Sequence, residues 1–298
     1  MFFNKSVSRS NFFIRLKSWE YWPFGIVQLP VIIYFFWLSL RARSLIFFSA
    51  SNPGILMGGM FGESKYDVLK KVPAQYVPKT VFVARSSNKC EIIKLMRENE
   101  LQLPVIFKPD LGERGFMVQR INDESEIERY LLKMKHPFLI QELVDLPLEF
   151  GVFYGRLPNH SKGKVTSVVM KEMLSVTGDG MSTLQELILN KERAKLQWEK
   201  LKEVHALRLD QVIPQGEIIE LVSIGNHCLG TKFLDGSHLI NERLSKTFDK
   251  ISQQIEGFYF GRFDLRCATV EDLYNGNVSV LELNGCGAEP AHIYQPGY

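Results

Sequence analysis

From residue 65 onward, the spacing of apolar positions changes along the chain, and these changes predict strands and helices in alternation. Short apolar or alternating runs bounded by turn residues predict the strands, whereas apolar residues three and four apart predict the helices. The chain is therefore expected to adopt a mixed α+β fold. The expected strands cover 80–84, 104–108, 138–143, 149–156, 164–173, 217–224, 261–266 and 278–284. The expected helices cover 88–98, 124–134 and a long stretch from the capping box Ser182–Gln185 to about Leu207.

The first 62 residues have a different pattern. Tyr21–Leu40 contains 20 residues without a charge, which is about the length that spans a bilayer core. Pro23 and Pro30 interrupt any helix that begins before Val31. A second uncharged stretch, Ser44–Gly62, follows closely, and ten of the 21 phenylalanines lie in residues 1–62. This part of the chain is expected to form an apolar, aromatic N-terminal segment.

Three interpretations of this segment stay open: a membrane-spanning helix, a monotopic or re-entrant segment at a membrane surface, or a helix buried against the main body or a partner. Residues 1–60 carry six basic side chains and one acidic one, a net charge of +5, whereas the remainder carries 30 basic and 32 acidic ones, a net charge of −2. The basic residues flank the apolar stretch, which favours attachment of residues 1–62 to a membrane surface. The main body has no basic excess, so nucleic acid is not an expected partner.

The remaining composition limits the class of protein. A length of 298 residues suggests roughly two domains. The four cysteines form no CxxC pair and the six histidines no HExxH motif, so a disulfide framework and a zinc site are both disfavoured. These features indicate a cytoplasmic protein, peripheral on or anchored in the inner face of the membrane. The expected division is 1–62 for the N-terminal segment and 63–298 for the main domain, with subdomains 63–136 and 137–298.

Candidate metal ligands lie near the C-terminal end of the chain. Alternate residues of a strand share a face, so Arg262 and Asp264 can point together, as can Glu282 and Asn284. Two carboxylates and an amide oxygen on adjacent strands suit Mg²⁺ that holds nucleotide phosphates. A hairpin-like turn is expected at Tyr274–Asn277, between the two strands.

Two further motifs indicate nucleotide binding. Lys108 ends a predicted buried strand, where it can reach a phosphate or a purine ring nitrogen. Glycines in the following segment, including Gly112 and Gly115, allow backbone N–H groups to approach phosphate closely. A third motif is the strand that contains Gln141 and Glu142. Its backbone can face an adenine edge, and a carboxylate such as Glu149, seven residues after Glu142, can accept hydrogen bonds from ribose hydroxyls.

In this order, the motifs resemble those of the ATP-grasp family, specifically its carboxylate–amine ligases. Gly261–Asp264 and Glu282-x-Asn284 look like the catalytic-arginine and magnesium motifs of D-alanine–D-alanine ligases, while Lys171–Ile188 is more similar to cyanophycin synthetases. The resemblance covers about Lys65–Cys286. It implies an ATP-grasp fold, in which two α/β subdomains clasp ATP, here preceded by the apolar N-terminal segment.

The resemblance also implies residue roles. Arg262 would be the catalytic residue that stabilises a tetrahedral oxyanion. Asp264, Glu282 and Asn284 would hold one or two Mg²⁺ ions. Asn226 and Lys232 fall where the family approaches its acyl substrate. The implied ATP-binding residues are Lys65, Lys108, Gly112, Gly115, Gln141, Glu142, Glu149 and Lys171.

The implied reaction joins a small-molecule carboxylate to a small-molecule amine through an acyl-phosphate, with ATP and Mg²⁺ as cofactors. The segment Gly285–Pro290 lacks the serine-containing turn of D-alanine–D-alanine ligases, so the resemblance does not extend to D-alanine as the substrate. The chain stops 14 residues after Asn284, which implies either a truncated product or replacement of the family's C-terminal helix by the N-terminal segment. Two alternatives stay open: ATP-dependent phosphoryl transfer to a small molecule, and a non-catalytic, membrane-attached nucleotide-binding module.

Overall fold

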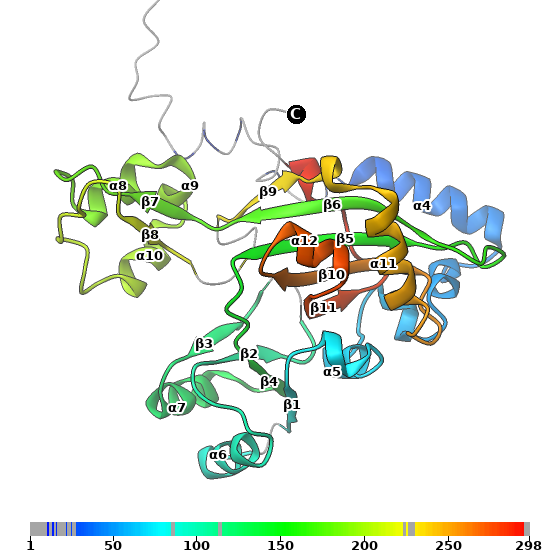
Figure 1. The fold of residues 1–298 in the computed structure, drawn as a ribbon, viewed down its shortest axis with the longest axis horizontal. Helices are drawn as coiled ribbons and strands as arrows, with labels where there is room; N and C mark the ends of the chain where they lie inside the picture. The colour runs from blue at the N-terminus through cyan, green and yellow to red at the C-terminus, as the bar shows by residue number, and fades with distance from the viewer. Residues whose placement is uncertain are drawn as a thin grey trace, which may run out of the picture. The chain divides into compact units, whose positions relative to one another are not determined.

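A computed structural model describes residues 28–84, 87–112, 115–222, 225 and 230–294, together with single residues 11, 14, 16, 22 and 25. The chain divides into two compact units, whose helices and strands are labelled in Figure 1. Unit 1 comprises 1–43, 171–234 and 293–298, and unit 2 comprises 44–170 and 235–292. The predicted N-terminal segment 1–62 is thus divided between the units at Arg43/Ser44. The predicted domain boundaries stay a prediction.

One sheet of unit 2 has four antiparallel strands in the order β1-β4-β2-β3. Helices α6 (Lys89–Glu98) and α7 (Glu124–Lys133) pack on it, with Ile92 and Ile127 fully buried in the shared core. Asn88 and Glu91 form a reciprocal capping box that fixes the start of α6. The strands are β1 (Thr80–Val83), β2 (Val105–Pro109), β3 (Gln119–Ile121) and β4 (Phe138–Glu142).

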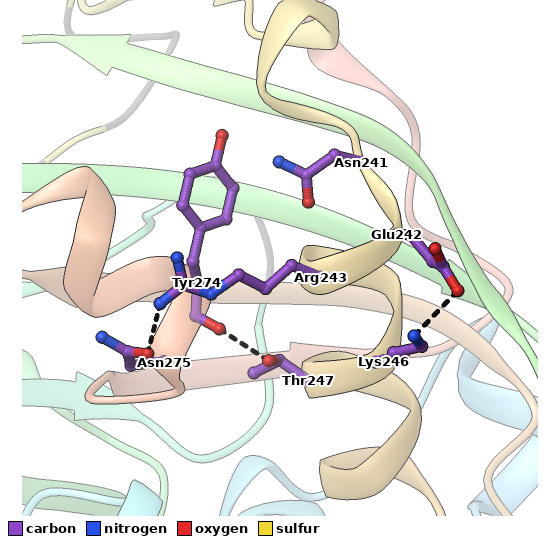
Figure 2. Close-up of a pocket in the computed structure, with 7 residues that line it drawn as sticks. All are labelled: Asn241, Glu242, Arg243, Lys246, Thr247, Tyr274 and Asn275. Carbon is purple, nitrogen blue, oxygen red and sulfur yellow. Dashed lines mark hydrogen bonds and ion pairs between the residues drawn. The ribbon is translucent and has the colours of Figure 1, made fainter.

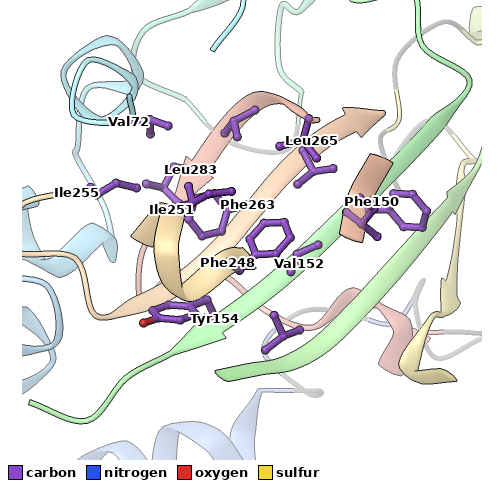
Figure 3. Close-up of a cluster of buried hydrophobic side chains, with 14 of the residues drawn as sticks. Val72, Phe150, Val152, Tyr154, Phe248, Ile251, Ile255, Phe263, Leu265 and Leu283 are labelled. Atoms are coloured by element: carbon purple, nitrogen blue, oxygen red, sulfur yellow. The ribbon is translucent and has the colours of Figure 1, made fainter. Parts of the chain in front are cut away.

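A second sheet has five strands in the order β11-β10-β5-β6-β9. Helix α11 (Glu242–Ser252) places Phe248 and Ile251 against this sheet, where they meet Val152 and Phe263 in the largest core cluster (Figure 3). Each of these four side chains is at most 1% exposed, so the core fixes the strands that carry the candidate site. The strands are β5 (Leu148–Gly155), β6 (Lys164–Glu172), β9 (Lys232–Asp235), β10 (Phe260–Cys267) and β11 (Ser279–Asn284).

Residues 44–62 form short turns of 3₁₀-helix in unit 2, η2 (Phe47–Ser51) and η3 (Leu56–Gly59), rather than a long helix. Asn52 is fully buried and makes four hydrogen bonds. Its Nδ2 donates to the carbonyls of Gly58 and Phe260, and its Oδ1 accepts from the amides of Tyr259 and Phe260. Asn52 therefore ties this segment to the first residue of β10.

Two glycine-containing stretches meet in unit 2. The amide of Cys286 donates to the carbonyl of Gly58 (3.0 Å), and the amide of Gly287 donates to that of Gly59 (2.8 Å). A Cβ on Gly285 would lie 2.2 Å from the Gly58 carbonyl oxygen, so the two backbones approach closely only because this position is glycine. Residues 44–62 thus support the loop that follows β11.

Unit 2 also contains short elements that connect these parts. Thr269 caps α12 (Val270–Asn275), which lies between β10 and β11. The other elements are α5 (Lys65–Leu69), η4 (Ala74–Tyr76), η6 (Ser237–Leu239) and η7 (Ala291–Tyr294), the last of which crosses the unit boundary in sequence.

Unit 1 contains a two-stranded antiparallel sheet, β7 (Ser175–Thr177) and β8 (Ile218–Glu220), and a core of its own. The predicted long helix up to Leu207 is wrong, because three short helices occupy this stretch. Its capping box consists of Thr183 and Glu186, one residue later than predicted, and the backbone of Lys191 is extended and ends the first helix. The helices are α8 (Leu184–Asn190), α9 (Glu192–Lys195) and α10 (Trp198–Val204).

Helix α4 (Leu29–Ala42) also belongs to unit 1. It begins two residues before Val31, and Pro30 lies in its first turn, where proline is tolerated because its missing N–H has no partner within the helix. Within the ranges given above, none of the helices combines the length and the apolar character that crossing a membrane requires.

The predicted α+β class is confirmed. The predicted strands and helices between 80 and 173 are present to within two residues, as are those at 261–266 and 278–284. Two further details of the prediction are wrong. Tyr274 and Asn275 end α12, with Gly276 in a left-handed C-terminal cap (φ 80°), so a helix rather than a hairpin turn precedes β11. Of the strand predicted at 217–224, the structure describes residues 217–222, and within these only β8 is a strand.

Candidate active site

Strands β10 and β11 bring the predicted metal ligands together. They pair antiparallel, with Arg262 opposite Asn284 and Asp264 opposite Glu282. Both Arg262 Nη2 and Asn284 Nδ2 donate to Asp264 Oδ2 at 2.8 Å. The side chains of Arg262 and Asp264 are 20% and 7% exposed, so the ion pair is largely withdrawn from water. As predicted, the side chains of Arg262 and Asp264 lie together on one face of β10.

Gly151 of β5 lies opposite Asp264 in the sheet and was not predicted as a site residue. A Cβ at this position would lie 3.1 Å from Arg262 Cδ and 3.4 Å from Asp264 Oδ1. The absence of a side chain here leaves room for the ion pair above the sheet. A glycine within an otherwise apolar strand is the sequence signal that indicates such a close approach.

Arg262 is held at both ends of its guanidinium. Its Nε and Nη2 donate to Asp264, and its Nη1 donates to the carbonyl oxygen of Glu289 at 2.8 Å. Burial opposes the charged form, but the carboxylates of Asp264, Glu282 and Glu289 together raise the pKa of Arg262 above its ordinary value. Arg262 is therefore a fixed cation.

Lys65 joins the cluster from helix α5. Its Nζ lies 3.3 Å from Glu282 Oε1 and also donates to the carbonyl of Gly112. The start of α5 is fixed by Asp110, which accepts hydrogen bonds from Ser64 Oγ (2.9 Å) and the Tyr66 amide (3.0 Å). Asp110 was not predicted as a positioning residue. The available signal was Ser64, directly before Lys65, because serine commonly caps the start of a helix.

Lys108 is the most deeply buried lysine of the cluster, with 7% of its surface exposed. Its Nζ donates to Gln141 Oε1 and to the carbonyl of Leu281, both at 2.9 Å. Burial lowers the pKa of Lys108 to about 8. The positive charge of Lys65 also lowers it, whereas the negative charges of Glu282 and Asp264 partly oppose the shift. Lys108 therefore links β2, β4 and β11 by hydrogen bonds, and Gln141 lies beside it as a candidate nucleotide contact.

Glu142 and Glu149 have different surroundings. Glu142 is exposed at the end of β4, and its Oε2 accepts from the Lys79 amide at 3.2 Å. The carboxylate of Glu149 is 7% exposed and accepts from Arg266 Nε at 2.9 Å. Arg266 also donates to the Val144 carbonyl, so this ion pair fixes the segment between β4 and β5. Arg266 was not predicted, and its place two residues after Asp264 on the same strand was the available signal.

The predicted phosphate loop has the backbone that its glycines allow. Gly112 and Gly115 have φ values of 147° and 69°, in the region that residues with a side chain rarely adopt. Residues 113 and 114 lie outside the described residues. The carbonyl of Gly112 accepts the hydrogen bond from Lys65, which connects the loop to the acidic cluster.

Three other predicted positions belong to unit 1 by sequence. Lys171 has its Nζ 5.7 Å from the centre of the Phe233 ring, and Lys232 pairs with Glu172 at 2.6 Å. Asn226 lies outside the described residues. The assignment of Lys171 to ATP stays a prediction.

Binding of Mg²⁺ depends on the oxygen donors that a site supplies. Among the residues that the structure describes, no group of three or more histidine, cysteine, aspartate and glutamate side chains could hold a metal ion. Asp264 and Glu282 supply two carboxylates in register, and Asn284 adds an amide. Mg²⁺ is usually held by one or two carboxylates with phosphate oxygens and water as its other ligands, so these residues fit the ion together with a nucleotide.

A separate hollow of about 610 Å³ lies between α11 and α12 (Figure 2). Its cation Arg243 pairs with Glu271 and also donates to Asn275 Oδ1, while Lys246 pairs with Glu242. None of the predicted catalytic, ATP-binding or metal-binding residues lines it. These charges are matched within the protein, so the hollow is not the candidate active site.

Comparisons with known proteins give similarities in structure only. No family model matches the chain, and no curated protein matches it. Among solved structures, a D-Ala:D-Ser ligase from Enterococcus faecalis is 15% identical, with 79% of this chain and 54% of that chain covered and a TM-score of 0.46. The D-alanine–D-alanine ligase from Bacillus anthracis is 12% identical, over 75% of this chain and 56% of that chain, with a TM-score of 0.40.

A structure described as an ATP-grasp ligase complexed with a minimal precursor is 13% identical, over 76% of this chain and 52% of that chain, with a TM-score of 0.40. The chain spans about half the length of these matched chains.

Proposed function

We propose that this protein is an ATP- and Mg²⁺-dependent ligase that joins a carboxylate to an amine through an acyl-phosphate. The observation that carries the proposal is the cluster on β10 and β11. There a fixed arginine, two carboxylates and an amide lie in register, with two lysines at hydrogen-bonding or ion-pair distance from β11. Fixed cations beside metal-binding oxygens are what phosphoryl transfer requires.

The metal would be held by Asp264, Glu282 and Asn284. When bound, Mg²⁺ would neutralise charge on the phosphoryl group in transfer. In the structure, Lys65 is paired with Glu282 and Arg262 with Asp264. Each carboxylate thus has a cation beside it that balances its charge, and carboxylate oxygens are ligands that suit Mg²⁺.

The nucleotide would be bound by residues on both sides of Lys108. We assign Lys108 to the α-phosphate and adenine, Gln141 and Glu142 to the adenine edge, and Glu149 to the ribose. The glycine backbone at 112–115 would cover the phosphates and exclude water from the reactive intermediate. Support comes from the direct contact of Lys108 with Gln141 and from the link between Lys65 and Gly112.

The proposed reaction has two steps. A substrate carboxylate oxygen attacks the γ-phosphorus of ATP, so that a P–O bond forms to the acyl oxygen, the bond to the β-phosphate breaks and ADP leaves. The amine then attacks the acyl carbon, phosphate leaves and the amine nitrogen loses a proton. Arg262, positioned by Asp264 and the Glu289 carbonyl, would stabilise the oxyanion formed in the second step.

The test is ADP release by the purified protein with ATP, Mg²⁺ and pools of small carboxylic acids and amines. Release that needs both substrate classes supports the ligase. Release with one acceptor and a stable phosphorylated product would replace the ligase with a phosphotransferase. Nucleotide binding without release under any pool would reject both enzymes.

The matched variants are Asp264→Asn and Glu271→Gln. Both convert a carboxylate to an amide beside an arginine, but only Asp264 lies in the proposed site. Asp264→Asn is expected to abolish ADP release while part of the nucleotide binding persists, and Glu271→Gln is expected to leave both unchanged. Normal turnover by Asp264→Asn would contradict the metal assignment. Removal of Mg²⁺ with a chelator should stop ADP release, and added Mg²⁺ should restore it.

A further inference from the structure

Most of the apolar surface of helix α4 is exposed. Eight of its fourteen residues are large apolar or aromatic side chains with at least 41% of their surface exposed, and its only buried residue is Ser39. Scattered exposed apolar residues are ordinary, but a contiguous run marks an interaction site. The exposed residues are Leu29, Val31, Ile32, Ile33, Tyr34, Phe36, Trp37 and Leu40.

The two sides of α4 nevertheless differ in exposure. Phe35, Leu38 and Ser39, which are three and four residues apart, form the less exposed stripe. The Ser39 hydroxyl donates to the Phe35 carbonyl at 2.9 Å, so the polar group of the buried residue is satisfied within the helix. The opposite stripe consists of Ile33, Phe36, Trp37 and Leu40, which are 63%, 55%, 47% and 79% exposed.

Length and charge determine what can cover this stripe. Fourteen residues rise about 21 Å, less than the roughly 30 Å of a bilayer's hydrocarbon core. Arg41 lies in the last turn with its guanidinium 4.9 Å from the centre of the Trp37 ring, and Arg43 follows at the C-terminal cap. No acidic residue occurs between Tyr21 and Arg43, and residues 1–60 carry a net charge of +5.

We propose that α4 docks on the surface of an anionic lipid bilayer, with the Ile33–Leu40 stripe in the interface and Arg41 and Arg43 at the headgroups. A tryptophan beside an arginine at the end of an apolar helix suits the headgroup boundary, where an apolar ring and a charged group are both stabilised. The absence of acidic side chains complements anionic lipid. This inference does not depend on the proposed ligase activity.

The experiment is flotation of the full-length protein with vesicles of phosphatidylcholine mixed with phosphatidylglycerol, and with vesicles of phosphatidylcholine alone. The wild-type protein should float with the mixed vesicles. Ile33→Glu combined with Leu40→Glu should abolish flotation, because both positions lie on the exposed stripe. Leu207→Glu is the matched control, since Leu207 is a fully exposed leucine of unit 1 outside α4. It should float like the wild type.

A second pair of changes tests the charge without altering the apolar stripe. Arg41→Gln with Arg43→Gln should weaken partitioning into the mixed vesicles about 30-fold, from about 5-fold for each basic residue near an anionic surface. Both arginines are exposed, so these variants should fold as the wild type does, which their thermal unfolding would check.

Three results would overturn the proposal. The first is wild-type protein that stays unbound in the presence of mixed vesicles. The second is flotation of the Ile33→Glu, Leu40→Glu variant at the wild-type level. The third is lipid-independent self-association that the same variant abolishes, because the stripe would then be covered by a second copy of the chain.

Discussion

Two of the arginine–carboxylate pairs in unit 2 have similar contacts and different surroundings. On β10, Arg262 and Asp264 are 20% and 7% exposed, and Asn284 donates to the same carboxylate oxygen. Between α11 and α12, Arg243 and Glu271 are 50% and 63% exposed. Attraction between charges is strong where water is excluded and weak where water screens it. The comparison shows that burial and shared partners, rather than distance, distinguish a candidate catalytic pair from a surface pair.

The largest expected effect is loss of activity at the buried pair. Arg262→Met removes the cation assigned to the oxyanion, and ligation should fall roughly 100- to 1000-fold, the range for removal of one such donor. Arg243→Met removes the exposed cation and should leave ligation unchanged. The two rates are measured as product formation under saturating ATP. Equal rates for the two variants would show that the buried Arg262 has no greater part in ligation than the exposed Arg243.

The next effect concerns stability at a third pair, Glu149 and Arg266, which is 7% and 17% exposed. Glu149→Gln leaves Arg266 buried without its counter-charge, and the free energy of unfolding should fall by about 3 kcal/mol. Urea denaturation with the wild type as reference measures the difference. A loss too small to resolve would mean that water reaches Arg266 and that the pair behaves like the exposed one.

Lys108 sharpens the comparison because it is a buried cation whose direct partners are the neutral groups of Gln141 and Leu281. Its pKa of about 8 lies below the ordinary lysine value of 10.5, so as the pH rises Lys108 loses its proton at a lower pH in the native state than in the unfolded state. Between pH 8 and about 10.5 the unfolded state binds more protons at this site, so the contribution of Lys108 to stability rises with pH.

Nucleotide affinity should change in the opposite direction. The phosphates need the charged lysine, so affinity is expected to fall about tenfold for each pH unit above 8. Binding measured by calorimetry between pH 7 and pH 10 tests this. Lys108→Met should bind more weakly at pH 7 and should lose this component of the pH dependence. If the nucleotide affinity of Lys108→Met changed with pH in the same way as that of the wild type, the titration that controls affinity would belong to another group.

The smallest effect is expected at the exposed pair. Glu271→Gln removes a charge whose pKa is lowered by hydrogen bonding to Arg243, but the pair lies in water. The midpoint of urea unfolding should not move measurably, and added salt should not alter that result. A clear shift would show that the hollow between α11 and α12 contributes to stability more than its exposure indicates.

The sequence predicted the strands of the site well because each has a local signal. The runs that became β2, β4, β10 and β11 are short, apolar and bounded by turn residues, and the alternation along β10 placed Arg262 and Asp264 on one face. The antiparallel register that sets Asp264 opposite Glu282 followed from neither run alone. It depends on the pairing of two strands separated by α12, which local spacing does not encode.

Other features were missed because their partners are distant in sequence. Asn52 lies in the uncharged stretch Ser44–Gly62, which was predicted only to be apolar. Its hydrogen-bond partners Tyr259 and Phe260 are 207 and 208 residues away, so no local pattern indicates them. The long helix was overpredicted because the polar residues between Leu184 and Leu207 favour helix locally, and the extended backbone of Lys191 interrupts it. Local propensity is a weak guide where tertiary packing decides.

The contact between Gly58 and Gly285–Gly287 has a consequence for the newly made chain. Cys286 Sγ approaches the Gly58 carbonyl across a separation of 228 residues, and both sides of this contact are needed to close it. At typical rates of synthesis, roughly ten to fifty seconds pass between the emergence of the two sides. Throughout that interval Phe48 and Ile55, buried in the finished protein, have no complete site to occupy. Residues 44–62 can therefore complete their packing only after Gly287 has been synthesised, so their burial is a late step in folding of the chain.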